Sequence, residues 1–113
     1  MVAGGSLATA APASATGGCS AGTLCVYSKV DFGGYKITST STNTCFRPNS
    51  VTANFGSYVQ SYVNNLSVDA HTYSSVSNNW IKRRTLVSGG FSSEVPLYSV
   101  IMVCIGNANP ENY

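Results

Sequence analysis

The side chains best suited to acid-base chemistry in this chain are His71 and Asp69, which lie two residues apart. A histidine oriented by a carboxylate can activate a nucleophile, but this chemistry also needs a reactive side chain held beside the ring. His71 is the only histidine, and the sequence has no Gly-x-Ser-x-Gly segment of the kind that presents a nucleophilic serine on a sharp turn. We therefore interpret His71 as a half-exposed strand residue and Asp69 as a solvated carboxylate next to a turn. We expect no enzymatic activity and no cofactor.

Four cysteines form the second reactive set: Cys19, Cys25, Cys45 and Cys104. They lack the paired Cys-x-x-Cys spacing of zinc sites, and an even number of cysteines in a short chain indicates two disulfides. Three pairings are open. We favour Cys19 with Cys25 as a local clip and Cys45 with Cys104 as a long-range staple.

A third group of side chains could contact a partner, because the only tryptophan and half of the basic residues lie together at Trp80, Lys82, Arg83 and Arg84. Tryptophan and arginine commonly anchor interfaces. The alternative is that Trp80 packs on the core while the three cations guard an edge strand. The net charge of +2 is too small to predict binding to nucleic acid or to a membrane surface.

Composition indicates the elements that must position these residues. The 113 residues fit one domain, of which 43% are hydrophobic and only 9% charged. Val, Thr, Tyr, Ile and Phe recur while strong helix formers are scarce, which favours strands joined by polar turns. No stretch approaches the roughly 20 apolar residues of a membrane helix. We expect an all-β monomer.

The amino end indicates export. The small, apolar stretch from Val2 ends in Ala13-Ser14-Ala15, a small-x-small pattern that signal peptidases cut. We therefore expect residues 1–15 to be a residual leader, residues 16–113 to form the domain, and the mature protein to be secreted.

Alternation of apolar and polar residues predicts the strands. Short strands are expected at residues 24–28 and 35–40, followed by a loop at 41–54 that the Cys45 disulfide would anchor. In residues 58–63 the period of two predicts that Val59, Ser61 and Val63 face the core. Further strands are expected at residues 70–74 and 81–87, and a long one at 95–105.

An internal repeat appears when Ser61 is aligned with Ser99. Val59 then matches Leu97 and Val63 matches Ile101, which suggests two similar β units. Any two amphipathic strands with a central serine would also align in this way.

The segment from Cys25 to Gly34 resembles the aromatic corner of the βγ-crystallin Greek key, with Tyr27, Phe32 and Gly34 at the matching positions. Together with the residues from Cys19 and those around Ser61, it is similar to the small secreted proteins of the Streptomyces metalloproteinase inhibitor family. The resemblance covers residues 19–65 well and 66–105 loosely. It implies a two-motif Greek-key βγ-crystallin-like sandwich, stapled by disulfides, in which Tyr27, Phe32, Gly34, Ser61 and Ser99 serve the fold.

Many βγ-crystallin units resemble one another in a calcium-binding loop with two leading Asx residues. In this chain only Glu94 keeps an acidic group at a leading position, and a single carboxylate cannot offset the dehydration of a divalent ion. Glu94 is thus a weak calcium candidate, and no other metal site is expected.

The resemblance implies a secreted proteinase inhibitor of the metalloproteinase type, acting on an extracellular protease through an exposed loop of a rigid β scaffold. The inhibitor that typifies the family closes its reactive loop with a second-half cysteine pair, whereas this chain has only Cys104 there. Its reactive residues therefore do not transfer by position. The alternative is a non-inhibitory extracellular structural or toxin-like binding protein of the same fold. Asn65-Leu66-Ser67 also matches a glycosylation acceptor, which a strand-end turn explains equally well.

Overall fold

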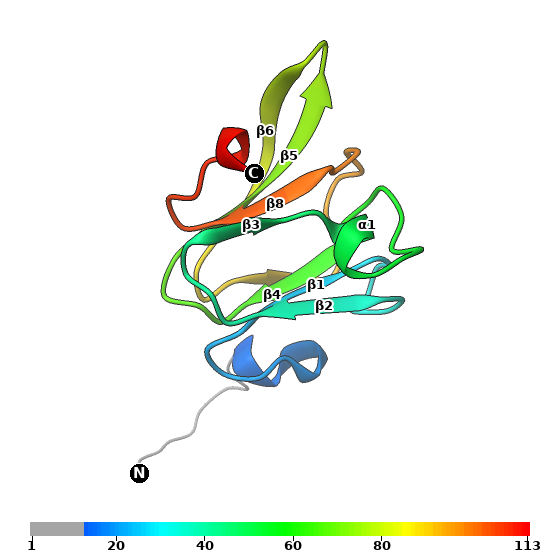
Figure 1. Cartoon of the computed structure of the whole chain (residues 1–113). Helices are drawn as coiled ribbons and strands as arrows, with labels where there is room; N and C mark the ends of the chain where they lie inside the picture. The colour runs from blue at the N-terminus through cyan, green and yellow to red at the C-terminus, as the bar shows by residue number, and fades with distance from the viewer. Residues whose placement is uncertain (1–12) are drawn as a thin grey trace.

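The computed structural model describes residues 13–113 and consists almost entirely of β-strands, arranged as two four-stranded antiparallel sheets packed face to face (Figure 1). The strands are β1 (Leu24–Tyr27), β2 (Lys36–Ser39), β3 (Thr44–Phe46), β4 (Ser61–Asn64), β5 (Ala70–Val76), β6 (Asn79–Leu86), β7 (Phe91–Ser92) and β8 (Met102–Ile105). Helical structure is limited to the short turns η1 (Ala13–Gly18), α1 (Pro48–Val51) and η2 (Pro110–Asn112). None of these described helices is long and apolar enough to cross a membrane.

The strand order reveals two interlocked units. One sheet has the order β2-β1-β4-β7 and the other β3-β8-β5-β6. We divide the chain into a first unit, residues 24–64, and a second unit, residues 70–105. The third strand of the first unit, β3, lies in the sheet of the second unit, and the third strand of the second unit, β7, lies in the sheet of the first. In each unit the fourth strand lies beside the first, which is the Greek-key connection. The predicted fold class, an all-β two-motif sandwich with two disulfides, is confirmed.

Backbone pairing defines which residues of the two units are equivalent. Tyr27 faces Ser61 across β1 and β4, and Tyr73 faces Met102 across β5 and β8. The amide that precedes each fourth strand donates to the carbonyl of the equivalent tyrosine, at 2.9 Å to Tyr27 and 2.8 Å to Tyr73. The predicted alignment of Ser61 with Ser99 is therefore wrong by three positions. The true counterpart of Ser61 is Met102.

The main core lies between the sheets. β1 directs Leu24 and Val26 inward, and β4 contributes Tyr62 to the same cluster. The prediction that Val59, Ser61 and Val63 share the core face holds only for Val59. Val63 instead packs on the outer side of its sheet, because Tyr62 takes the inward position. Further members of the main cluster are Ile37, Phe55, Leu66, Ala70, Leu86, Val95, Val100, Val103 and Ile105.

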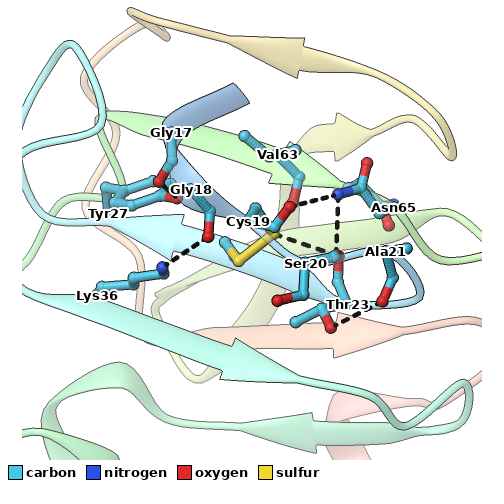
Figure 2. The surroundings of a disulfide bond; sticks show 12 residues. Gly17, Gly18, Cys19, Ser20, Ala21, Thr23, Tyr27, Lys36, Val63 and Asn65 are labelled. Atoms are coloured by element: carbon cyan, nitrogen blue, oxygen red, sulfur yellow. Dashed lines mark hydrogen bonds between the residues drawn. A yellow bond between two sulfur atoms is a disulfide. The ribbon is translucent and has the colours of Figure 1, made fainter. Parts of the chain in front are cut away.

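The outer face of the first sheet is covered by the chain just before β1. Cys25, Tyr27 and Val63 form a small apolar cluster there with Cys19, which is disulfide-bonded to Cys25. Figure 2 shows the side chains of Tyr27 and Lys36 reaching from the sheet toward this segment. The Tyr27 hydroxyl donates to the Gly17 carbonyl at 2.9 Å, and Lys36 Nζ donates to the Gly18 carbonyl at 3.3 Å. Strand β1 is therefore buried on both faces, with all four residues inaccessible.

The pairing Cys19–Cys25 and Cys45–Cys104 is the one favoured from the sequence. Cys45 and Cys104 face each other in register on β3 and β8, so this disulfide links a strand of the first unit to a strand of the second. The predicted leader, residues 1–15, falls almost wholly outside the described residues.

Two expected segments differ from the structure. Residues 41–54 are not only a loop, because they contain β3, which Cys45 joins to β8, and the helical turn α1 that begins at Pro48. The long strand expected at residues 95–105 is wrong as well. Only Met102–Ile105 forms a strand, and residues 94–100 have neither strand, helix nor turn. Proline at position 96 explains the difference, because proline has no amide proton to donate to a β-ladder.

Candidate functional site

The residues of the aromatic corner build a turn that is locked from inside. Between β1 and β2 the chain folds back with Asp31 and Phe32 at positive φ. The Phe32 amide donates to Ser61 Oγ at 3.0 Å, and Ser61 Oγ donates to the Lys29 carbonyl at 2.6 Å. The rings of Tyr27 and Phe32 meet edge to face with centroids 5.6 Å apart. Ser61, Tyr27 and Phe32 therefore make their contacts within the turn and with the strand beside it.

Gly34 is required in this turn for two reasons. Its φ is +73°, a conformation that costs other residues free energy, and a Cβ here would collide with Ser28 Oγ and lie 2.6 Å from Lys29 Cγ. Ser28 Oγ occupies the space because it accepts a hydrogen bond from the Tyr35 amide at 2.8 Å.

The equivalent turn of the second unit does not fold back on its sheet (Figure 1). β5 and β6 are joined by Ser77 and Asn78, both at positive φ, in a tight two-residue hairpin turn. β8 pairs only with Ala70 to Tyr73 of β5, so the remainder of the β5–β6 hairpin projects beyond the sheet (Figure 1). We call residues 74–83, which include the bulge residue Arg83, the projecting hairpin.

The structure separates the four predicted contact residues. Trp80 packs edge to face against Tyr73, with the Arg47 guanidinium 5.7 Å from its ring centroid, and lies with Lys82 on the outer face of the second sheet. Arg83, at a bulge in the β5–β6 pairing, instead donates from Nε to Ser74 Oγ at 3.1 Å. Arg84 is exposed opposite Thr72. Strand alternation and the bulge therefore prevent one shared cationic patch.

His71 and Asp69 do not form a catalytic pair. His71 Nδ1 lies 3.1 Å from Thr85 Oγ1, whereas the Asp69 carboxylate accepts a hydrogen bond from the Ser88 amide at 2.9 Å. Burial is the main cause that lowers the pKa of His71, nearby Lys82 lowers it further, and Asp69 opposes the shift. His71 lines an open cavity of about 370 Å³ with Trp80 and Lys82. The hydroxyl beside the imidazole is that of Thr85, which faces His71 across β5 and β6, whereas Asp69 is directed to Ser88 and does not orient the ring.

Glu94 lies exposed between β7 and β8, and its backbone amide donates a hydrogen bond to Ser92 Oγ at 3.3 Å. Within residues 13–113, no three His, Cys, Asp or Glu side chains gather in a way that could hold a metal ion. The side-chain Nδ2 of Asn65, the first residue of the Asn65-Leu66-Ser67 triplet, donates to the carbonyls of Cys19 and Ser20 at 3.3 and 3.0 Å. This side chain therefore helps attach the segment that covers the first sheet.

The feature that sequence reasoning missed is the exposed segment from Pro96 to Ser99. Val95 and Val100 on either side are 6% and 7% exposed and belong to the main core, whereas all four residues between them are exposed. The Val95 amide donates to the Gln60 carbonyl at 3.0 Å, and the Val100 amide donates to the Ser57 carbonyl at 2.7 Å. We call residues 96–99 the anchored loop. Pro96 was the signal that could have revealed it.

The anchored loop lies against the projecting hairpin. Ser74 Oγ donates to the carbonyl of Ser99, and the guanidinium of Arg83 lies 5.0 Å from the ring centroid of Tyr98. The Ile101 amide that follows the loop donates to the Tyr73 carbonyl at 2.8 Å. One end of the sandwich therefore presents an exposed loop that core side chains and hydrogen bonds hold in place.

Comparison with known proteins found no match among curated proteins and no match among solved structures. The model of peptidase inhibitor family I36 matches residues 12–79, which contain the whole first unit, β5 and the tip of the projecting hairpin. Because this match covers more than half of the 113 residues, the chain belongs to peptidase inhibitor family I36 and is not an enzyme.

Proposed function

We propose that this protein is a secreted inhibitor of a metalloproteinase-type protease and that it acts by placing an exposed loop of a rigid β scaffold in the protease cleft. Membership of peptidase inhibitor family I36 supports the inhibitor role. The single observation that carries the mechanism is the anchored loop, whose two flanking valines are buried while the residues between them are exposed.

Rigidity favours this mechanism. Ordering a flexible loop on binding costs free energy for each immobilised residue, and a loop that is already held avoids much of this cost. The anchored loop is fixed at Val95 and Val100, and β8, which follows it, is joined to β3 by the Cys45–Cys104 disulfide. The loop therefore begins and ends on parts of the scaffold that have little freedom to move.

Secretion is the second part of the proposal. Disulfides persist in oxidising extracellular surroundings, and both disulfides of this chain fit such a setting. We further propose that a leader ends near Ala15, which would leave Gly17 and Gly18 in the mature chain to accept hydrogen bonds from Tyr27 and Lys36. The mass of the protein recovered from culture medium would test this boundary.

Titration against proteases tests the inhibitor mechanism. The purified, oxidised chain is added to a thermolysin-like metalloprotease and, in parallel, to a serine protease. Stoichiometric loss of the metalloprotease activity is expected. A small active-site ligand of the protease should compete with the chain, because both would occupy the cleft. Binding without competition would contradict the loop mechanism, and full activity of both enzymes would contradict the inhibitor role.

A further inference from the structure

The anchored loop carries an apolar side chain in a position where the fold makes no use of it. Leu97 is 61% exposed, the highest value among the large hydrophobic side chains of residues 13–113. A large apolar side chain held outside the core has a large area to bury against a partner. Other exposed apolar residues, such as Val51 and Phe91, lie on a helical turn or a paired strand, where the backbone is already hydrogen-bonded.

The backbone around Leu97 suits a protease cleft. Within the anchored loop and its flanking valines the chain forms no turn or strand, and none of these residues has a positive φ. Proteases bind the residues around a cleaved bond in an extended conformation, in which backbone amides and carbonyls can form hydrogen bonds with the cleft. A tight turn such as Ser77-Asn78 at the tip of the projecting hairpin cannot adopt that conformation, because both of its residues have positive φ.

The neighbouring residues fix the loop without covering Leu97. Tyr98, which is 43% exposed, lies under the Arg83 guanidinium, and Ser74 holds the Ser99 carbonyl from the side of the projecting hairpin. Arg83 is itself fixed by its hydrogen bond to Ser74 Oγ. Ser74 and Arg83 thus act as positioning residues for the loop.

We propose that Leu97 is the specificity-determining residue of this inhibitor and that it enters the apolar pocket with which the target protease selects its substrates. This inference rests on the proposed inhibitor function. It implies that the targets are proteases that prefer a large aliphatic residue beside the bond they cleave, whichever catalytic group they use. A protease whose pocket is selective for lysine or arginine should bind the wild-type chain poorly.

The test compares Leu97→Asp with Val87→Asp in one inhibition assay against an apolar-pocket metalloprotease, with wild type measured alongside. Val87 is 52% exposed and lies outside the anchored loop, which makes it a matched control. Losing an anchor residue of an interface commonly costs 30-fold or more in affinity, so we expect Leu97→Asp to raise the inhibition constant by about that factor or more. Val87→Asp should leave it within about 3-fold. Equal inhibition by Leu97→Asp and wild type would overturn the inference while leaving the inhibitor function in place.

A second variant tests the pocket directly. Leu97→Arg should weaken inhibition of the apolar-pocket enzyme and strengthen binding to a protease selective for arginine, because only the side chain that enters the pocket changes. Thermal melting of each variant checks that the fold is retained. If wild type inhibited only arginine-selective proteases, the role of Leu97 would be overturned. If wild type inhibited no protease at all, the underlying inhibitor function would be overturned instead.

Discussion

The two Greek-key units share a topology but use their first turn in opposite ways. In the first unit the turn after β1 folds back on its own sheet and is held there by Ser61. In the second unit the turn after β5 is two residues long, and its hairpin projects from the sheet beside the anchored loop. The turn of the first unit is thus bound to its own sheet, whereas the hairpin of the second unit projects and lies beside the exposed anchored loop.

The two units also differ at the strand residue that could hold the turn. The position of Ser61 in the first unit is taken by Met102 in the second, and methionine cannot donate a hydrogen bond to a folded turn. Met102 instead packs with Cys104 and Cys45 on the outer face of its sheet. The two units therefore differ at this register position, and they also differ in the length of the turn, which runs over residues 28–35 in the first unit and over Ser77 and Asn78 in the second.

The largest expected effect concerns how the units are tied together. Replacing Cys45 and Cys104 by alanine should lower the free energy of unfolding by about 4 kcal/mol, because the disulfide spans 59 residues and restricts the unfolded chain strongly. Replacing Cys19 and Cys25, which are six residues apart, should cost about 2 kcal/mol. Urea unfolding of both double variants measures the two losses. If the variant without Cys19–Cys25 lost more stability, the segment that covers the first sheet would matter more to the fold than the Cys45–Cys104 link between the units.

The next effect isolates the folded turn. Gly34→Ala should cost about 3 kcal/mol, because the new Cβ meets Ser28 Oγ and Lys29 in addition to the strain of positive φ. Gly89→Ala is the matched control: φ is +77° at this position, but a Cβ would contact nothing within 4 Å, so only about 1 kcal/mol should be lost. Chemical denaturation of both variants and wild type measures the two losses in the free energy of unfolding. Equal losses would show that the enclosure around Gly34 has no energetic weight.

A smaller effect tests the corrected equivalence of the units. Ser61 is fully buried, and Ser61→Ala leaves the Phe32 amide and the Lys29 carbonyl without their partner, which should cost about 2 kcal/mol. Ser99→Ala should change stability by less than about 0.5 kcal/mol, because Ser99 is exposed and contacts Ser74 through its backbone carbonyl. Thermal melts of the two variants provide the comparison. Similar destabilisation by both variants would contradict the corrected equivalence, in which Met102 and not Ser99 is the counterpart of Ser61.

The smallest effect is a pH dependence confined to the second unit. Burial and Lys82 lower the pKa of His71 in the folded protein, so the unfolded chain binds a proton more readily. The contribution of His71 to stability is therefore complete above its unfolded pKa of about 6.5 and declines as the pH falls through the lower folded value. Between pH 8 and pH 5 the melting temperature should fall more for wild type than for His71→Asn. His71 is the only histidine, so an identical fall in the variant would assign the dependence to other groups.

Much of this fold follows from local signals in the sequence. The composition favours strands, the spacing of Tyr27, Phe32 and Gly34 marks the folded turn, and the disulfide pairing is the one that the sequence favours. These features depend on residues close together in the chain or on residue chemistry. The expected strands at residues 24–28 and 35–40 accordingly differ from β1 and β2 by one residue at each end, apart from the shared start at Leu24.

The end of the molecule that we assign to protease contact was harder to predict. Val95, Leu97, Ser99 and Ile101 alternate as a strand would, although no neighbouring strand pairs with them and only Val95 is buried. Alternation reports a pattern of polarity, whereas burial depends on which segments the fold brings alongside. In the same way, Trp80 and Arg83 are close in sequence but lie on different sides of the hairpin, because the bulge at Arg83 changes the alternation.

The central position of β8 has a consequence for a molecule that is nicked. β8 lies between β3 and β5, and Cys104 fastens it to β3. If a protease cut one peptide bond between Val95 and Val100, the severed tail would keep its place in the sheet and stay covalently attached through sulfur. A cut inhibitor would therefore remain a single particle with both new ends still near each other, and no piece could diffuse away until the disulfide was reduced.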